Sequence, residues 1–158
     1  APEVKHLIQQ AAELYESDGA ELPLLKAFLR SPESLNVLVA LNRYYYYQHR
    51  LTDSLLISEK ALLIIRVRID FPEQWQTLTL NHISCAPKEQ LTAIRLYLFT
   101  LKSIGFLNMR LNNLELSQSI FEKLVTLDHE DRLGAKSLLE IVSFKINEKR
   151  GIYQIRHA

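Results

Sequence analysis

A histidine and a cysteine, His82 and Cys85, are three residues apart, and Cys85 is the one cysteine of the chain. On a helix this spacing would place the imidazole and the thiol on one turn, where both could bind a metal ion. A zinc site needs further ligands at close spacing, and no second thiol is present to supply one. Pro87 also argues against a regular helix here. We therefore predict that His82 lies in a loop, that Cys85 is a partly buried thiol, and that the chain binds no metal.

The other chemically capable residues do not form a recognisable catalytic pattern. The chain has no HExxH, GxGxxG, GxxxxGK[ST] or GxSxG sequence. Its acidic residues are placed like solvated helix faces and caps, and no pair of them stands out for acid–base catalysis. The acidic residues considered are Glu13, Glu16, Glu115, Glu122, Asp128, Glu130 and Asp131. We predict that the protein is not an enzyme and uses no cofactor.

The most unusual stretch is a run of four tyrosines at residues 44–47. Successive helical residues point about 100° apart, so the four rings cannot all be buried together. One interpretation is that the rings simply fill interfaces within helical hairpins. The other is that Tyr45 packs inside while Tyr46 and Tyr47 turn toward a partner, because tyrosine offers contact area and a polar tip.

These tyrosines end the first helix of a predicted antiparallel hairpin over residues 41–61. Gln48, His49 and Arg50 form its turn, and Thr52 or Asp53 caps the second helix. Apolar residues at three- and four-residue steps predict the other helices. The expected helices are about 4–17, 20–30, a second hairpin helix that continues to about 70, 73–77, 88–110, 114–127 and 131–149. A loop is expected from 77 to Pro87.

The hairpin over residues 41–61 resembles the tetratricopeptide repeat, a helix–turn–helix unit of about 34 residues. Leu41 and Asn42 occupy the Leu-Gly pair of its first helix, and Tyr45 takes the aromatic position. Ser54 and Ala61 take the small positions of its second helix. Two further segments share this register. Their matching residues are Leu7, Ala20, Leu24, Ala27 and Pro32 in the first, and Leu101, Ile104, Gly105, Ser117, Phe121 and Leu124 in the second.

This resemblance implies an all-α fold with three hairpins stacked as a right-handed α-solenoid in a single domain, residues 1–158. The repeats cover about 1–34, 35–68 and 98–131. An insertion covers 69–97, a capping helix 131–149 and a tail 150–158. Repeat arrays need such a cap to cover their last apolar surface.

In this family the first helix of each repeat lines a concave groove that binds protein segments. By register, the implied partner-binding residues are Lys5, Gln9, Glu13, Asn36, Val39, Arg43, Tyr46, Tyr47, Lys102, Phe106, Met109 and Arg110. The set mixes cations with aromatic rings and suits a peptide or helix with acidic and apolar side chains. Some members grip the terminal carboxylate of chaperone tails. Lys5 fits that clamp, but Ala40, Phe99 and Ser103 depart from it, so we do not expect one here.

Three segments more loosely resemble small tetratricopeptide repeat proteins found with bacterial nitrogen-fixation genes. They are RYYYYQHR, RLYLFTLKSIGFLNMRL and DRLGAKSLLEIV. This resemblance implies a bacterial origin and an accessory role for nitrogenase or another large enzyme assembly.

Composition and charge limit the kinds of partner and the cellular compartment that we expect for this protein. A chain of 158 residues can bury a sizeable core, and its formal net charge of +1 gives no reason to expect nucleic acid or a membrane surface as partner. No apolar run reaches the roughly 18 residues of a spanning helix. A lone cysteine fits a reducing compartment, and we predict a cytoplasmic protein. Since the chain begins at Ala1 and its one methionine is Met109, we expect a processed or trimmed product.

We therefore predict a non-catalytic adaptor or chaperone-like module that binds a protein segment in its concave groove. The alternative is a self-associating structural repeat protein that forms a homodimer and leaves that groove empty.

Overall fold

The structure, a computed structural model, describes residues 1–14 and 19–157, and the side chains among them except those of residues 153–155 and 157. The contacts between residues divide the chain into two compact units, Ala1–Ile64 and Ile65–Ala158, which are called unit 1 and unit 2 below. The predicted single domain stays a prediction. Throughout the described residues the regular structure is helical, which confirms the all-α class, while the stacking of three repeats into a solenoid stays a prediction.

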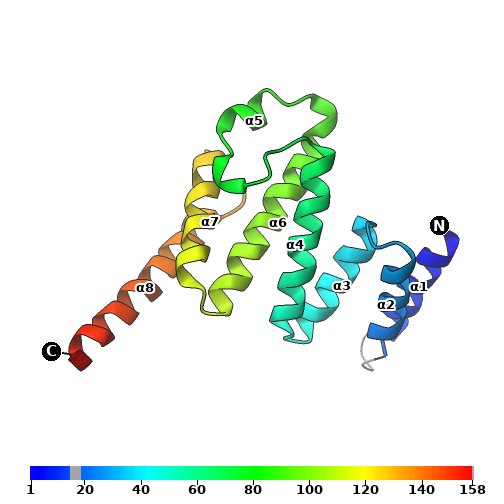
Figure 1. Ribbon diagram of the computed structural model, residues 1–158, viewed down its shortest axis with the longest axis horizontal. Coiled ribbons are helices and arrows are strands. Elements are labelled where there is room, and N and C mark those ends of the chain that lie inside the picture. The colour runs from blue at the N-terminus through cyan, green and yellow to red at the C-terminus, as the bar shows by residue number, and fades with distance from the viewer. Residues whose placement is uncertain (15–18, 158) are drawn as a thin grey trace. The chain divides into compact units, whose positions relative to one another are not determined.

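Unit 1 contains α1 (Pro2–Glu13), α2 (Glu21–Arg30), α3 (Leu35–Tyr47) and the first part of α4 (Leu51–Arg68) (Figure 1). Helix α2 packs against both α1 and α3. Small and branched side chains on matching faces close this packing. The buried residues of this core are Val4, Leu7, Ala11, Ala20, Leu24, Ala27, Val37, Leu41, Tyr44 and Tyr45.

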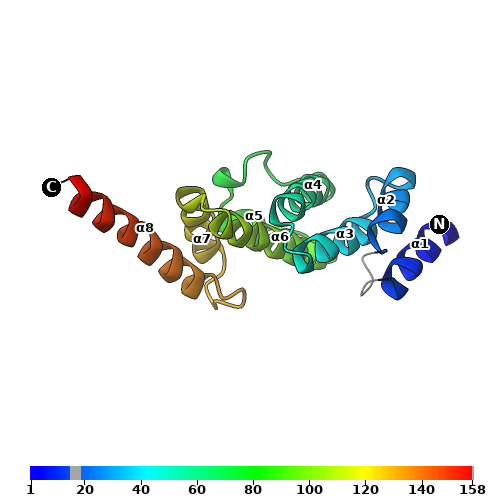
Figure 2. The same ribbon diagram turned by 90° about the horizontal axis from the view of Figure 1, so that it is seen from below.

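Unit 2 contains the end of α4, the 3₁₀ turns η2 (Trp75–Thr77) and η3 (Lys88–Gln90), and the helices α5 (Leu80–Ser84), α6 (Leu91–Arg110), α7 (Leu114–Leu127) and α8 (Ala135–His157). Helix α7 packs between α6 and α8, and α5 rests on α7. The largest fully buried side chains of this unit are Ile65, Leu78, Ile94, Tyr97, Leu101, Ile120, Phe121, Leu124 and Val142. Both views show the second half of α8 running on past α7 (Figures 1 and 2).

The hairpins α3–α4 and α6–α7 share local geometry at positions 63 residues apart. The turn residues His49 and Asn112 both have positive φ, at 58° and 69°. In each hairpin a serine of the second helix bonds to the first helix. Ser54 Oγ donates to Asn42 Oδ1, and Ser117 Oγ donates to the carbonyl of Gly105 at 2.7 Å. These are the small positions that the sequence register aligns, so the two hairpins repeat one local design.

Several predicted helix boundaries need correction. Helix α4 begins at Leu51, so Thr52 and Asp53 lie inside its first turn and do not cap it. Asp53 instead accepts a hydrogen bond from Arg50 Nε at 2.9 Å. Helix α1 ends at Glu13, and residues 15–17 of the predicted helix lie outside the described residues. Helix α8 begins at Ala135 and continues to His157, so the predicted tail extends the helix.

The predicted loop before Pro87 contains the short helix α5. Its N-terminus carries a capping box, in which the Thr79 side chain accepts from the backbone of His82 and the His82 ring accepts from the Thr79 N–H at 2.9 Å. This pairing satisfies two of the free N–H donors at the helix start, and Pro87 lies beyond the end of the helix. The prediction that His82 lies in a loop is therefore wrong. Cys85, expected to be partly buried, is exposed.

Buried groups anchor the segment between α4 and α5 to the rest of unit 2. Leu78 is 1% exposed, and its carbonyl accepts a hydrogen bond from Lys123 Nζ at 2.8 Å. Phe71 packs edge-on against Tyr97, with ring centroids 5.1 Å apart. These contacts attach the segment before α5 to α6 and α7.

Candidate functional site

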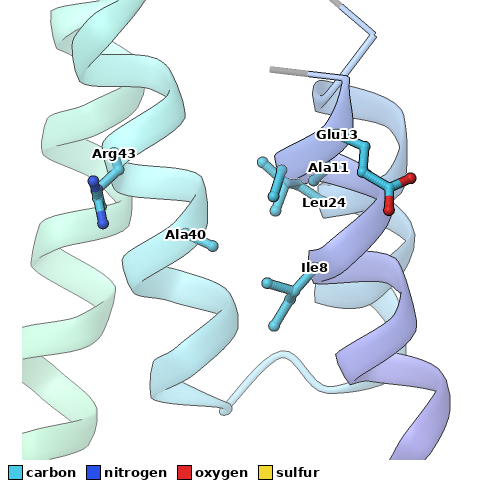
Figure 3. Close-up of a pocket in the computed structure, with 7 residues that line it drawn as sticks. Ile8, Ala11, Glu13, Leu24, Ala40 and Arg43 are labelled. Carbon is cyan, nitrogen blue, oxygen red and sulfur yellow. The ribbon is translucent and has the colours of Figure 1, made fainter.

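A groove in unit 1 lies between α3 and the α1–α2 pair and has a volume of about 650 Å³. Its apolar lining comes from Ile8, Ala11, Ala12, Leu24 and Ala40, and its polar lining from Glu13 and Arg43. Figure 3 shows Ile8 and Ala40 pointing toward one another across the gap between α1 and α3. Pockets that take ligands commonly enclose about 300–1,000 Å³ and have mostly apolar walls with a few polar groups. The groove has the size and lining of a binding site.

Helical periodicity relates this groove to the predicted partner-binding residues. Arg43 lines it directly. On α1, Lys5 lies three residues before Ile8, and Gln9 lies three and four residues before Ala12 and Glu13, which also line the groove. On α3, Asn36 and Tyr47 lie one turn to either side of Ala40 and Arg43. Lys5, Gln9, Asn36, Val39, Arg43 and Tyr47 are exposed, and Tyr46 is partly exposed.

The four tyrosines of α3 differ in burial, as expected for side chains that point in different directions around a helix. Tyr44 and Tyr45 are 3% and 6% exposed, while Tyr47 is 58% exposed. The interpretation that all four rings fill interfaces is therefore wrong. Tyr46 and Tyr47 pack edge-on at 5.6 Å between centroids, so the exposed ring is supported by its neighbour. The binding role of both rings stays a prediction.

A polar cluster ties α2 to the turn between α3 and α4. Arg50 Nη1 lies 2.8 Å from Glu21 Oε2, and the guanidinium carbon of Arg50 lies 4.5 Å from the centre of the Tyr45 ring. Tyr45 Oη donates to Glu21 Oε1 at 3.3 Å. Burial and the neighbouring Glu21 carboxylate raise the pKa of Tyr45, and hydrogen bonds to Glu21 and Asp53 raise the pKa of Arg50. This cluster joins the first residue of α2 to the end of α3 and to the turn that follows it.

The remaining predicted residues lie in unit 2 on α6. Arg110 is exposed, Lys102 and Phe106 are partly exposed, and Met109 is 8% exposed. Lys102 Nζ lies 5.5 Å from the centre of the Phe99 ring, and the Arg110 guanidinium lies 5.9 Å from that of Phe106. Lys102, Phe106 and Arg110 therefore share one side of α6 in unit 2, and Lys5, Gln9 and Arg43 lie in unit 1.

Two further pockets lie in unit 2. One, of about 410 Å³, is lined by Ile83, Leu91, Ile94, Arg95, Leu98, Phe99, Leu127, Asp128, His129, Glu130, Arg132 and Leu133. The other, of about 340 Å³, is lined by Met109, Arg110, Asn112, Leu114, Lys145, Glu148 and Lys149. Sequence reasoning included Met109 and Arg110 but missed Lys145 and Lys149. Their four-residue spacing on a helix was the signal that could have found them.

In the part of the chain that the structure describes, the potential metal ligands do not cluster. No three residues among its His, Cys, Asp and Glu side chains are grouped to hold a metal ion. Within the same residues, no helix combines the length and the apolar character that crossing a membrane requires.

Comparison with known proteins identifies a relative in Azotobacter chroococcum mcd 1. It is described as the uncharacterized 19.8 kDa protein in the nifW 5′ region, and it is 38% identical to this chain over 143 residues. The match covers 90% of this chain and 80% of the relative. No protein-family model matches the chain, so its likeness to the tetratricopeptide repeat stays a resemblance. No solved structure matches it either. The extent and identity of the match show that this chain belongs to the same family as the uncharacterized 19.8 kDa protein in the nifW 5′ region of Azotobacter chroococcum.

Proposed function

We propose that this protein is a non-catalytic interaction module of the tetratricopeptide type, and that the unit 1 groove binds a peptide or helix of a protein partner. The observation that carries the proposal is the groove itself. Among the described residues that line it, five are apolar, and two, Glu13 and Arg43, carry charges of opposite sign. An apolar floor offers contact area for a partner side chain, and the charges can orient the partner.

Exposed groups around the groove extend the proposed contact surface. Tyr47 and Val39 on α3 are 58% and 46% exposed, so both present apolar surface to solvent. Aromatic residues supply many of the strongest anchors in protein interfaces. We assign Tyr47 the role of an anchor beside the groove.

The partner that we propose belongs to the nitrogen-fixation machinery. This step depends on the relative, which is described by its position in the nifW 5′ region. An accessory protein that assists a large enzyme assembly needs binding surfaces and no catalytic centre of its own. The cytoplasm is the compartment that we propose for this activity.

Site-directed photocrosslinking in a lysate of nitrogen-fixing cells tests the proposal. A photoreactive residue at Ala40, in the groove, should trap a protein that the same residue at Leu29 does not trap. Leu29 is the matched control, because it lies on α2 and is 78% exposed. Tyr47→Ala should weaken binding of the trapped partner by about 2 kcal/mol in calorimetry without loss of helicity. Equal trapping at both positions would overturn the groove as the site.

Self-association is the second candidate, and one observation favours it. Helix α8 exposes Ile141, Phe144 and Ile152, at 46%, 66% and 50%. These positions fall on one side of the helix, where a second copy could cover them. Sedimentation over a range of concentrations distinguishes the candidates. A mass that doubles with concentration, and that Phe144→Ser returns to a monomer, supports self-association.

A further inference from the structure

The unit 2 pocket of about 410 Å³ has walls from three segments and is called the apolar pocket below. Helix α5 supplies Ile83, and the end of α7 with the connection that follows it supplies residues 127–130 and 132–133. The lining residues of α6 are spaced by three and four positions and therefore share one face of that helix. They are Leu91, Ile94, Arg95, Leu98 and Phe99. Four of the lining residues belong to the predicted insertion 69–97, so the pocket depends on a segment outside the repeat register.

Contacts within the protein hold the walls of the apolar pocket in place. The Asp128 carboxylate accepts from the backbone N–H groups of Arg132 and Leu133 at 3.2 and 2.8 Å, which fixes the connection after α7. Leu91 and Phe99 are 39% and 55% exposed, so part of the apolar lining is open to solvent. Sites for small molecules are commonly preformed, and they combine apolar walls with a few polar groups. The volume and the lining of this pocket fit that description.

The charged side chains that line the apolar pocket differ in whether they already have partners. Glu130 Oε2 accepts from Arg132 Nε at 2.7 Å, and Asp128 accepts from the two backbone N–H groups described above. Among the side chains that the structure describes, the Arg95 guanidinium has no ion pair or hydrogen bond. His129 adds an exposed imidazole to the lining. Arg95 therefore leaves one positive charge available beside an apolar surface.

We propose that the apolar pocket binds a small amphiphilic anion, with a hydrocarbon tail against its apolar walls and a single carboxylate at Arg95. A guanidinium can meet a carboxylate through two parallel N–H groups, which fixes the position of the head group. Asp128 and Glu130 line the same pocket, and their negative charges disfavour a head group with two charges, such as a phosphate monoester. This site goes beyond the proposed function, because it takes a small molecule and the unit 1 groove takes a protein segment.

A hydrocarbon tail suits this lining better than a peptide does. The N–H and C=O groups of a peptide need hydrogen-bond partners once water is removed, and burying them unpaired costs free energy. On the α6 wall Arg95 is the polar side chain of the described lining, and the other residues there are apolar. A hydrocarbon needs no such partners and gains affinity with each methylene that it buries. A short peptide with a C-terminal leucine, acetyl-Gly-Ser-Leu, therefore serves as the competing ligand in the test.

The test is a titration of the isotope-labelled full chain with octanoate, hexanoate, octanol and octylammonium, followed through the backbone amide resonances in NMR. We expect octanoate to shift resonances around Leu91, Phe99 and Leu133. Octanoate should bind about 15-fold more tightly than hexanoate, because each buried methylene contributes about fourfold. It should bind about fivefold more tightly than octanol, which has the same tail and no charge. Octylammonium, which carries the opposite charge, should bind most weakly of the three eight-carbon ligands.

Matched variants separate the charge of the site from its apolar walls. Arg95→Gln should make octanoate bind no more tightly than octanol, whereas Arg150→Gln, at an exposed arginine of α8 outside the lining, should leave their affinity ratio unchanged. Leu91→Ser should weaken octanoate and octanol alike, by about threefold, because it removes apolar surface. Leu116→Ser is its control, since Leu116 is 44% exposed on α7 and lies outside the lining. Circular dichroism of each variant checks that the helices are retained.

Four results would overturn the proposal. They are the absence of resonance shifts at the pocket up to the solubility limit of octanoate, equal affinities of octanoate, octanol and octylammonium, the same affinity ratio in Arg95→Gln and Arg150→Gln, and tighter binding of acetyl-Gly-Ser-Leu than of octanoate. Trapping at Ala40 tests the unit 1 groove with a different ligand and a different measurement. Either proposal can therefore fail while the other stands.

Discussion

Replacing Gly105 with alanine tests the closest approach between α6 and α7. The added Cβ would lie 2.8 Å from Phe121 Cε1 and 2.9 Å from Ile120 Cγ2. Phe121 and Ile120 are 0% and 1% exposed, so neither ring nor methyl can move into solvent. Overpacking of this kind costs about 1–3 kcal/mol, while glycine to alanine within a helix gains about 1 kcal/mol. We expect Gly105→Ala to lower the free energy of unfolding by up to about 2 kcal/mol.

Gly151 supplies the matched control, because it lies in α8 and a Cβ there would meet nothing within 4 Å. Gly151→Ala should raise stability by at most about 1 kcal/mol, through helix propensity alone. The difference between the two variants isolates the clash and should be about 1–3 kcal/mol. Urea unfolding followed by far-UV circular dichroism measures both. If the two variants are equally stable, α6 and α7 do not approach at Gly105 and the packing of this hairpin is misassigned.

Three further perturbations test other parts of the structure. Burial raises the pKa of Tyr97 to about 12, above about 10 in the unfolded chain, so the stability that it contributes is present below pH 10 and is lost as pH rises toward 12. The difference in unfolding free energy between the parent and Tyr97→Phe should follow that window by up to about 2.7 kcal/mol, and a constant difference would refute it. Glu21→Gln removes a partly exposed ion pair with Arg50 and should cost no more than about 1 kcal/mol, less in high salt, whereas Glu3→Gln at the more exposed pair with Arg30 should cost less. Leu78→Ala should cost about 2–5 kcal/mol and make the segment around residues 72–87 the first site of limited proteolysis, and unchanged proteolysis would show that Leu78 does not anchor it.

Local signals in the sequence were sufficient for the central hairpins. The predicted helix over residues 114–127 coincides with α7, and the tyrosine run ends α3 as expected. Both hairpin turns use a residue that tolerates positive φ, His49 and Asn112, and short-range hydrogen bonds complete them. These features depend on residues within a few positions of one another, so the sequence alone is sufficient to predict them.

The insertion was mispredicted because a local capping signal was missed and because its anchoring depends on a distant residue. Pro87 indicated a loop, but the capping box of Thr79 and His82 starts α5 at Leu80, and the helix ends at Ser84, before the proline. Leu78 is buried, and its carbonyl accepts a hydrogen bond from Lys123 Nζ, 45 residues away along the chain. No local pattern in the insertion encodes that contact.

The sequence by itself determined the helical class, the two small-residue hairpin contacts and the side of α6 on which Lys102, Phe106 and Arg110 lie. Periodicity carries that information, because it depends only on the 3.6-residue turn of the helix. The tertiary structure decided which surfaces become pockets. Arg110 meets Lys145 and Lys149 only because α7 packs between α6 and α8 and brings their ends together. Tertiary packing also decided which side chains are buried. Tyr45 and Tyr47 are both tyrosines and lie two residues apart on α3. Packing against α2 buries Tyr45, whereas Tyr47 stays exposed.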